Sequence, residues 1–340
     1  MNEPTVTRYF EALSLQIRSF SDSRIIDTVY FGGGTPSVLG AFRLCKLLSL
    51  FRERLTLAPD CEITAEVNPG TVNFDELKML RLGGFNRLSV GVQSSNDGIL
   101  GVLGRIHSFD DAKRCIADAH RAGFDNISAD LMFGIPNMSA EELKKSVCDI
   151  MSTEVKHISI YSLMIEEGTP FFEKRMTLAL PDEDAEEEQY ELICRMMSKN
   201  GYEHYEISSF CIPGFESRHN LRYWSCEEYF GFGAGAHSYY NGRRFSCKND
   251  IHTFSELSHA DPLTCTDYYS AIPLGDIERE EERIMLGLRT RYGALLNEAQ
   301  TITAKRYAEL GYGYFEGDRF VLNEKGYRVS NKIISDILFS

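Results

Sequence analysis

The sequence predicts an α/β protein whose core is a mostly parallel sheet. Two observations lead to this prediction. Short runs rich in β-branched residues recur through residues 1–208, and between them lie amphipathic stretches with helical spacing. Strand–helix alternation of this kind gives parallel strands joined by right-handed crossovers. Two architectures fit the pattern: a (β/α) barrel, complete or partial, and an open doubly wound sheet.

The expected strands and helices alternate along the chain. Strands are expected at 25–31, 62–67, 87–92, 126–132, 157–163 and 203–208. Helices are expected at 38–55, 74–82, 110–122, 140–151 and 185–199. Thr35 before Pro36 predicts a helix start, because threonine caps helices and proline favours the first helical position. Gly83, Gly84 and Gly123 lie where helices should stop, and the acidic run 182–188 predicts a solvated helix start rather than a metal site.

After residue 208 the pattern changes, and three parts are expected. Residues 1–208 form the partial barrel. Residues 209–280 form a motif-bearing and connecting region, rich in Gly, Tyr and His in its first part. From 281 the pattern reads helix, helix, a hairpin around 316–318 and a last helix, which predicts a small α+β, winged-helix-like domain at 281–340. The near balance of charges in this part favours a docking domain over a DNA-binding one.

The 340-residue chain is acidic, with 36 Lys and Arg against 50 Asp and Glu and a net charge of −14. A nucleic-acid-binding protein needs basic groups to neutralise phosphates, so no nucleic-acid partner is expected. No stretch reaches the ~18 consecutive apolar residues of a membrane span. Residues 1–20 lack the apolar core of a signal peptide. We therefore expect a cytoplasmic protein with no integral membrane segment.

Nine cysteines are scattered through the chain, with no two closer than 15 residues. Because there is no CxxC or CxxxC pair, the spacing carries no local signature of a zinc or iron–sulfur site. Free thiols in a reducing compartment are expected. No metal-ligating residue is assigned.

Polar residues follow the expected strands at their carboxyl ends, where parallel α/β folds bind ligands. Gly32, Gly33 and Gly34 follow the first strand and would let a ligand approach bare backbone N–H groups. Neither a dinucleotide fingerprint nor a Walker A loop is present. Glu66, Gln93 and Asp130 are polar groups on strands otherwise suited to burial, and buried charge is costly without a partner. Three such groups at one edge predict a pocket.

The pocket chemistry and two nearby motifs leave alternatives open. Carboxylates and an amide suit a ligand with an ammonium group, hydroxyls or a ribose. Arg105 either binds a carboxylate in bidentate fashion or is an exposed loop residue. His219, close to the only tryptophan, and His237, in a glycine-rich segment, either ligate a metal or haem or are hydrogen-bonded core groups.

Short motifs follow one another along the chain in a recognisable order. They are GGGTPS at 32–37, EVNP at 66–69, RLSVGVQS at 87–94, LGRIH at 103–107, DLMFGIP at 130–136, YSL at 161–163, EEGTP at 166–170 and LPD at 180–182. Together they resemble the radical SAM proteins related to oxygen-independent coproporphyrinogen III oxidase, which use S-adenosylmethionine (SAM). YEIS at 205–208, HNLRYW at 219–224 and GAHS at 235–238 are similar to the HemW branch, the haem chaperones. The resemblance spans residues 9–331 and implies a TIM-like radical SAM barrel.

The resemblance implies a site for the methionine part of SAM. Gly33, Gly34 and Thr35 match the loop that holds the amino end of that methionine. Glu66 matches a residue that binds the methionine moiety. Arg105 matches the residue that contacts the SAM carboxylate.

The resemblance also implies contacts to the ribose and to haem. Gln93 and Asp130 match residues that face the ribose of SAM. His219 belongs to the HNxxYW motif implicated in haem binding, and His237 is a second, weaker match to a haem-binding histidine.

One family motif has no counterpart in this sequence. The family carries CxxxCxxC ahead of a helix resembling 7–20, and its three thiolates hold a [4Fe–4S] cluster. None of the nine cysteines can replace that motif by spacing. We expect a truncated sequence that has lost the first barrel strand and the cluster loop, with a cluster-free descendant as the alternative. Since no cluster can deliver an electron, the chain as written is not expected to cleave SAM, and no catalytic residue is assigned.

Three functions remain open at this point. The leading hypothesis is a haem chaperone that binds haem and passes it to a haem-requiring protein. The alternatives are a coproporphyrinogen III oxidase-like radical SAM enzyme of porphyrin biosynthesis and a cluster-free module that binds SAM or haem. The partners expected are haem and a haem-accepting protein, with a homodimer left open.

Overall fold

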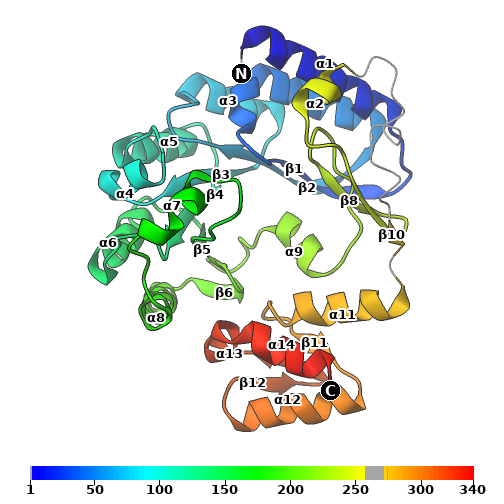
Figure 1. Ribbon diagram of the computed structural model, residues 1–340. Helices are drawn as coiled ribbons and strands as arrows, with labels where there is room; N and C mark the ends of the chain where they lie inside the picture. Colours follow the sequence, from blue (N-terminus) through cyan, green and yellow to red (C-terminus); the bar gives the residue numbers. More distant parts are fainter. Residues whose placement is uncertain (1, 257–271, 274) are drawn as a thin grey trace.

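The computed structural model describes residues 2–256, 272–273 and 275–340 (Figure 1). Its core is a curled sheet of seven strands in the order β1-β2-β3-β4-β5-β7-β6. The strands are β1 (Ile25–Phe31), β2 (Thr56–Val67), β3 (Arg87–Gln93), β4 (Asn126–Phe133), β5 (His157–Ser162), β6 (Glu203–Glu206) and β7 (Ser209–Cys211). Neighbours from β1 to β5 are parallel. The predicted parallel α/β sheet is confirmed, and it forms a half-barrel.

The last expected strand, 203–208, reverses before its predicted end. β6 stops at Glu206, whose carboxylate accepts a 3.0 Å hydrogen bond from the backbone N–H of Ser208. The chain then turns back into β7, which pairs antiparallel with both β5 and β6. β6 therefore points the same way as β5, with β7 inserted between them.

Helices cover the outer face of the sheet (Figure 1). Those of this layer are α1 (Glu3–Ser19), α2 (Ala41–Arg54), α3 (Phe74–Gly83), α4 (Asp97–Val102), α5 (Phe109–Arg121), α6 (Ala140–Met151) and α8 (Glu183–Lys199). The short helix α7 (Pro170–Lys174) lies between β5 and α8 in the chain. Reciprocal side-chain and backbone hydrogen bonds cap the starts of α3, α5 and α6. Gly84 ends α3 in the left-handed region at φ +103°, as predicted.

One predicted helix start moves in the structure, and another is confirmed. Pro36–Leu39 form a 3-10 turn, and Thr35 makes no capping hydrogen bond. α2 begins only at Ala41, because Gly40 at φ +81° separates the turn from the helix. Asp182 caps α8 through the backbone N–H of Ala185, so the acidic run does begin a helix as predicted.

The central strand β3 shows how the sheet divides an apolar outer face from a polar inner one. Leu88, Val90 and Val92 are fully buried in the main core beneath the helices. Successive strand residues point to opposite faces, so Ser89 and Gln93 point inward. The inner face is therefore where polar strand-end groups meet.

Residues 209–256 carry elements that the sequence pattern did not predict. They are the short helix α9 (Arg218–Trp224), the strands β8 (His237–Tyr240) and β9 (Arg243–Ser246), and α10 (Ile251–Ser255). β9 also pairs with β10 (Ile272–Pro273). Within the described residues, β1 pairs only with β2, so it is one edge of the main sheet, and α9 contacts it. Cys265 lies outside the described residues.

The last part of the chain follows the order of elements predicted for 281–340. It contains α11 (Asp276–Gly287), β11 (Ala294–Leu295), α12 (Glu298–Glu309), β12 (Gly313–Glu316), β13 (Arg319–Leu322), α13 (Glu324–Arg328) and α14 (Ser330–Leu338). β12 and β13 form the expected hairpin, whereas the expected final helix is split at Val329. The division at 208 and 280 stays a prediction. Among the described helices, none combines the length and apolar character that crossing a bilayer requires.

Candidate functional site

The glycine loop after β1 closes directly over a carboxylate. Tyr30, the penultimate residue of β1, donates a 2.7 Å hydrogen bond from its hydroxyl to Oε1 of Glu66 on β2. A Cβ on Gly32 would lie 2.7 Å from that same oxygen, so only glycine fits there. Gly33 and Gly34 adopt φ values of +78° and +131°, which L side chains rarely take.

A second carboxylate, Asp130 on β4, lies in the electrostatic field of the first. Burial, and then the negative charge of Glu66, raise the pKa of Asp130 to about 7. Burial likewise raises the pKa of Glu66, against hydrogen bonds from Tyr30 and Gly33. Ser89 donates to Asp130 at 3.2 Å. Two coupled carboxylates of raised pKa form a site that a cationic group would stabilise.

Gln93, the last residue of β3, adopts an unusual backbone conformation. It is buried and has φ of +71° where the pairing of β3 with β4 is irregular. A Cβ on Gly91 would lie 3.2 Å from its amide nitrogen and 2.9 Å from Oδ1 of Asn68. Asn68 in turn donates to Thr35 Oγ1 at 3.0 Å. The structure therefore connects Thr35 to the ends of β2 and β3.

Arg105 and His107, neighbours in one loop, have different surroundings. The imidazole of His107 is buried, and its Nε2 lies 3.2 Å from the backbone carbonyl of Val92. His107 therefore holds the loop against β3. Arg105 is half-buried, and its positive charge lowers the pKa of Asp130, an effect smaller than those of burial and of Glu66.

His219 sits at the start of α9 with both ring nitrogens in hydrogen-bond contact. Nδ1 lies 2.9 Å from Thr28 Oγ1 on β1, and Nε2 lies 2.8 Å from the Tyr223 hydroxyl. Its ring stacks on Tyr30 at 4.9 Å between centroids. Burial lowers the pKa of His219 to about 4, so the imidazole is neutral at pH 7. His237 is exposed at the start of β8, and no hydrogen bond or ring contact joins it to His219 in the described structure.

A carboxylate that the sequence did not single out fixes the start of α9. Oε1 of buried Glu62 accepts a 3.0 Å hydrogen bond from the backbone N–H of His219, and Oε2 accepts one of 3.2 Å from Arg218. An anion at a helix N-terminus satisfies unpaired N–H groups. Tyr30, Asn68 and Glu62 were all missed as site residues. Only Asn68, inside the EVNP motif, carried a sequence signal.

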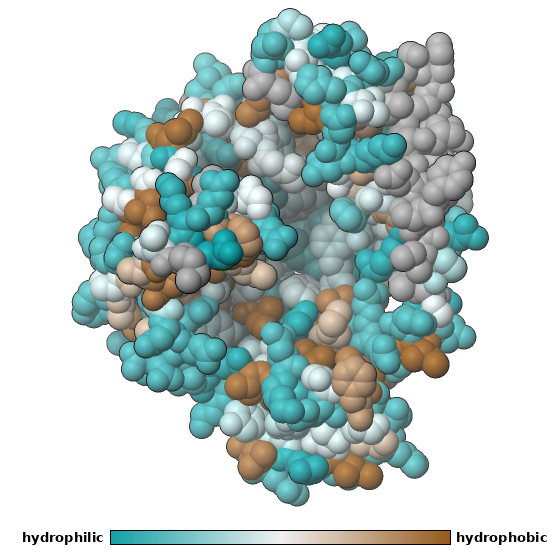
Figure 2. Space-filling model, viewed as in Figure 1, coloured by the Kyte–Doolittle hydropathy of each residue, from teal (hydrophilic) through white to brown (hydrophobic). Residues whose placement is uncertain are grey.

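Two cavities flank α9, and Trp224 lines both. One, of about 390 Å³, is lined by aromatic side chains, including those of Tyr161, Tyr223 and Tyr229. The other, of about 620 Å³, lies between α9, α11 and the β12–β13 hairpin. Figure 2 shows this face of the molecule hollowed between the main sheet and the C-terminal helices.

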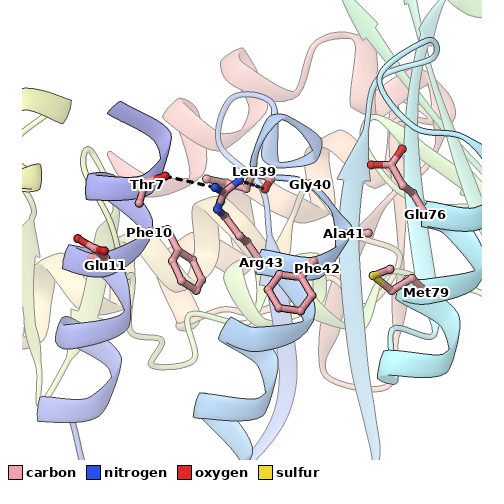
Figure 3. Close-up of a pocket in the computed structure, with 10 residues that line it drawn as sticks. All are labelled: Thr7, Phe10, Glu11, Leu39, Gly40, Ala41, Phe42, Arg43, Glu76 and Met79. Carbon is pink, nitrogen blue, oxygen red and sulfur yellow. Dashed lines mark hydrogen bonds between the residues drawn. The ribbon is translucent and has the colours of Figure 1, made fainter. Parts of the chain in front are cut away.

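A separate groove lies in the outer helix layer. Phe10 of α1 and Phe42 of α2 line it, together with Met79 of α3 (Figure 3). Arg43 donates to Thr7 Oγ1 and to the Leu39 carbonyl, each at 3.3 Å. None of the predicted SAM or haem residues lines this groove.

The donor groups present fit SAM but not an iron–sulfur cluster. The strand-end carboxylates, amide and glycine loop suit an ammonium group and ribose hydroxyls. The eight described cysteines are all free. Among the described residues, one group of three metal-ligating types comes together, Cys194, His204 and Glu324, and it holds a single thiol. A [4Fe–4S] cluster needs several thiolates, so the described residues do not fit one.

Comparison with known proteins agrees with the predicted resemblance. Residues 2–149 match the model of the radical SAM superfamily. The chain is 33% identical to "Heme chaperone HemW" of Lactococcus lactis subsp. lactis, covering 99% of this chain and 91% of that protein. It is 37% identical to "Heme chaperone HemW" of Bacillus subtilis, covering 84% and 73%.

A solved structure shows the same fold. Coproporphyrinogen III oxidase (HemN) from Escherichia coli, described as a radical SAM enzyme, superposes with a TM-score of 0.81 over 99% of this chain and 84% of that one. The sequence identity is 18%, so this likeness shows the fold alone.

Proposed function

This chain belongs to the HemW family of radical SAM proteins, and we propose that it binds haem and delivers it to a haem-requiring protein. The relatives named heme chaperone, at 33% and 37% identity, support the proposal. One observation of this structure carries it: Tyr30 joins the helix of the HNxxYW motif to the strand-end pocket. Its ring stacks on His219 while its hydroxyl donates to Glu66.

Haem in this proposal binds along α9. Tyr223 and Trp224 line an aromatic cavity, and flat porphyrins favour aromatic faces. A neutral imidazole is the form that ligates iron, and His219 is neutral. To ligate, it would exchange its hydrogen bond with Tyr223 or with Thr28 for a bond to iron. His237 is a second candidate ligand for the haem iron.

SAM in this proposal binds at the strand ends. Glu66 would face the methionine ammonium, with Arg105 toward the methionine carboxylate. Gln93 and Asp130 would face the ribose, and the loop Gly33–Thr35 would enclose the amino end. The raised pKa of Asp130 and of Glu66 supports a cationic ligand here, because its charge would let both acids ionise.

A cluster-free binding module is the second candidate function. The absence of a thiolate set among the described cysteines favours it over a porphyrin oxidase, whose chemistry needs the cluster. Such a module would bind SAM or haem without bond cleavage. A cytoplasmic location and a haem-accepting partner remain part of the chaperone proposal.

Haem titration followed by Soret absorbance tests the proposal. The wild type should bind haemin, and His219→Ala should weaken binding at least tenfold or shift the Soret band. His252→Ala is the matched control, because His252 is an exposed histidine on α10. Haemin binding that is equal in all three proteins would refute the role of His219. No haemin binding by the wild type would refute the chaperone function.

A further inference from the structure

The larger cavity beside α9 is lined by more basic than acidic side chains, although the chain as a whole is acidic. Its lining includes four arginines, Arg218, Arg222, Arg283 and Arg319, and two glutamates. The whole chain carries a net charge of −14. A local excess of positive groups in an acidic protein attracts an anionic ligand.

Most of these arginines already have partners inside the protein. Arg222 forms ion pairs with Asp27 and Glu227. Arg218 donates to the carbonyl of Asp60 at 2.7 Å. Arg283 pairs with Glu280 and donates to the carbonyl of Leu295 at 2.9 Å.

Arg319, the first residue of β13, is the exception. It is half-buried, and within the part of the chain that the structure describes its guanidinium has no ion pair and no hydrogen bond. Its donors are therefore available to a ligand in the cavity. A guanidinium binds a carboxylate with two parallel hydrogen bonds.

An aromatic wall lies next to this free cation. Trp224, of the HNxxYW motif, and Tyr292 line the same cavity. Trp224 also lines the neighbouring aromatic cavity, with Tyr223 and Tyr229. A ligand that reaches from one cavity to the other past Trp224 would need an anionic end and a flat apolar body. The volume of about 620 Å³ is within the usual range for small-molecule sites, ~300–1,000 Å³.

We propose that this cavity binds the propionate carboxylates of a porphyrin through Arg319, with the macrocycle lying against Trp224. The inference rests on the proposed function, because haem is the ligand that the chaperone would carry. It adds a site that binds the carboxylates of the ligand. The β12–β13 hairpin and α11, in the C-terminal part of the chain, form this site. Arg319 is the binding residue here, because the other three arginines of the lining are already paired within the protein.

Quenching of tryptophan fluorescence provides a direct readout, because Trp224 is the only tryptophan in the chain. Three ligands should be titrated: haemin, metal-free protoporphyrin IX, and haemin dimethyl ester, whose carboxylates are blocked. Haemin and protoporphyrin IX should quench Trp224. The ester should bind the wild type about tenfold more weakly than haemin, since it lacks the anionic groups.

Arg319→Gln removes the free cation. Arg195→Gln is its matched control, because Arg195 is an exposed arginine on α8. Arg319→Gln should weaken haemin and protoporphyrin IX about tenfold, leave the ester unchanged, and keep the circular dichroism of the wild type. Arg195→Gln should bind all three ligands as the wild type does.

The outcomes separate this inference from the proposed function. If haemin binds but neither esterification of the ligand nor Arg319→Gln lowers the affinity, the proposal of a carboxylate-binding site is wrong and the proposal of haem binding stands. If protoporphyrin IX binds through Arg319 while haemin gives no iron-dependent Soret shift, the carboxylate-binding site is confirmed and the proposed ligation of iron is wrong. If no porphyrin quenches Trp224, both are overturned.

Discussion

The hydroxyl of Tyr30 donates a 2.7 Å hydrogen bond to Oε1 of the half-buried Glu66, and this contact lowers the pKa of the carboxyl group. Burial raises the pKa of Glu66, and the Tyr30 hydroxyl opposes that rise. The same tyrosine ring stacks on His219. One side chain therefore connects the two sites that the family motifs mark.

Tyr30→Phe should affect the two sites differently. It keeps the ring against His219 but removes the hydroxyl, so the pKa of Glu66 should rise further. SAM affinity measured by calorimetry at pH 7 should fall about three- to tenfold, and less at pH 9. Haemin affinity should stay within about twofold of the wild type. A SAM affinity that is unchanged at both pH values would contradict the role given to Glu66.

Asp130 should make the free protein less stable as the pH rises. Its pKa is about 7 in the folded state, above the ordinary 3.8, so the folded state holds more protons between those values. The free energy of unfolding should therefore fall from about pH 4 to about pH 7 and the loss should be complete above that. Asp130→Asn should remove this fall and stabilise the protein at pH 8 by ~1–3 kcal/mol in urea denaturation. The same variant should weaken SAM binding.

Stability at about pH 3 is the control for Asp130→Asn. There the aspartate is mostly protonated in both the folded and the unfolded protein, so the variant and the wild type should unfold at similar urea concentrations. A variant that is less stable than the wild type at pH 8 would show that the carboxylate is already compensated in the free protein.

The glycine loop should tolerate no side chain at its first position. In Gly32→Ala the new Cβ would lie 2.3 Å from the Tyr30 ring and 2.7 Å from Oε1 of Glu66. Both side chains must then move, which should cost ~1–3 kcal/mol of stability and abolish detectable SAM binding. Gly101→Ala is the matched control, since a Cβ there meets open space on helix α4. It should be neutral or stabilise by up to ~1 kcal/mol in thermal unfolding.

Local patterns in the sequence predict the strands and several of the polar residues that form this site. The strands, the glycine loop and the carboxylates Glu66 and Asp130 follow from burial patterns and from what comes after each strand, and the structure brings them together at one edge. The pairing of His219 with Tyr30 could not be predicted in this way, since it joins residues 189 positions apart in the sequence. Partners at such separation depend on how α9 folds back onto β1.

Other differences have the same physical origin. β7 pairs between β5 and β6 because the chain reverses after Glu206, and a three-residue strand leaves no periodic signal. Thr35 sits before a proline, as a cap should, but its hydroxyl accepts from Asn68 instead of capping a helix. In both places a tertiary hydrogen bond overrides the local pattern.

Glu62 should control the position of α9 and hence haem binding. Its carboxylate accepts hydrogen bonds from the backbone N–H groups of Arg218 and His219, and it is buried beneath the helix start. Glu62→Ala leaves both N–H groups unpaired, so stability should fall by ~1–3 kcal/mol, and haemin affinity should fall several-fold. Asp60→Asn is the control: Asp60 also contacts Arg218, but its side chain is 78% exposed and such pairs contribute little. Haemin titration and Trp224 fluorescence of both variants check the prediction, and an α9 site that binds haemin equally well in Glu62→Ala would show that the cap does not position His219.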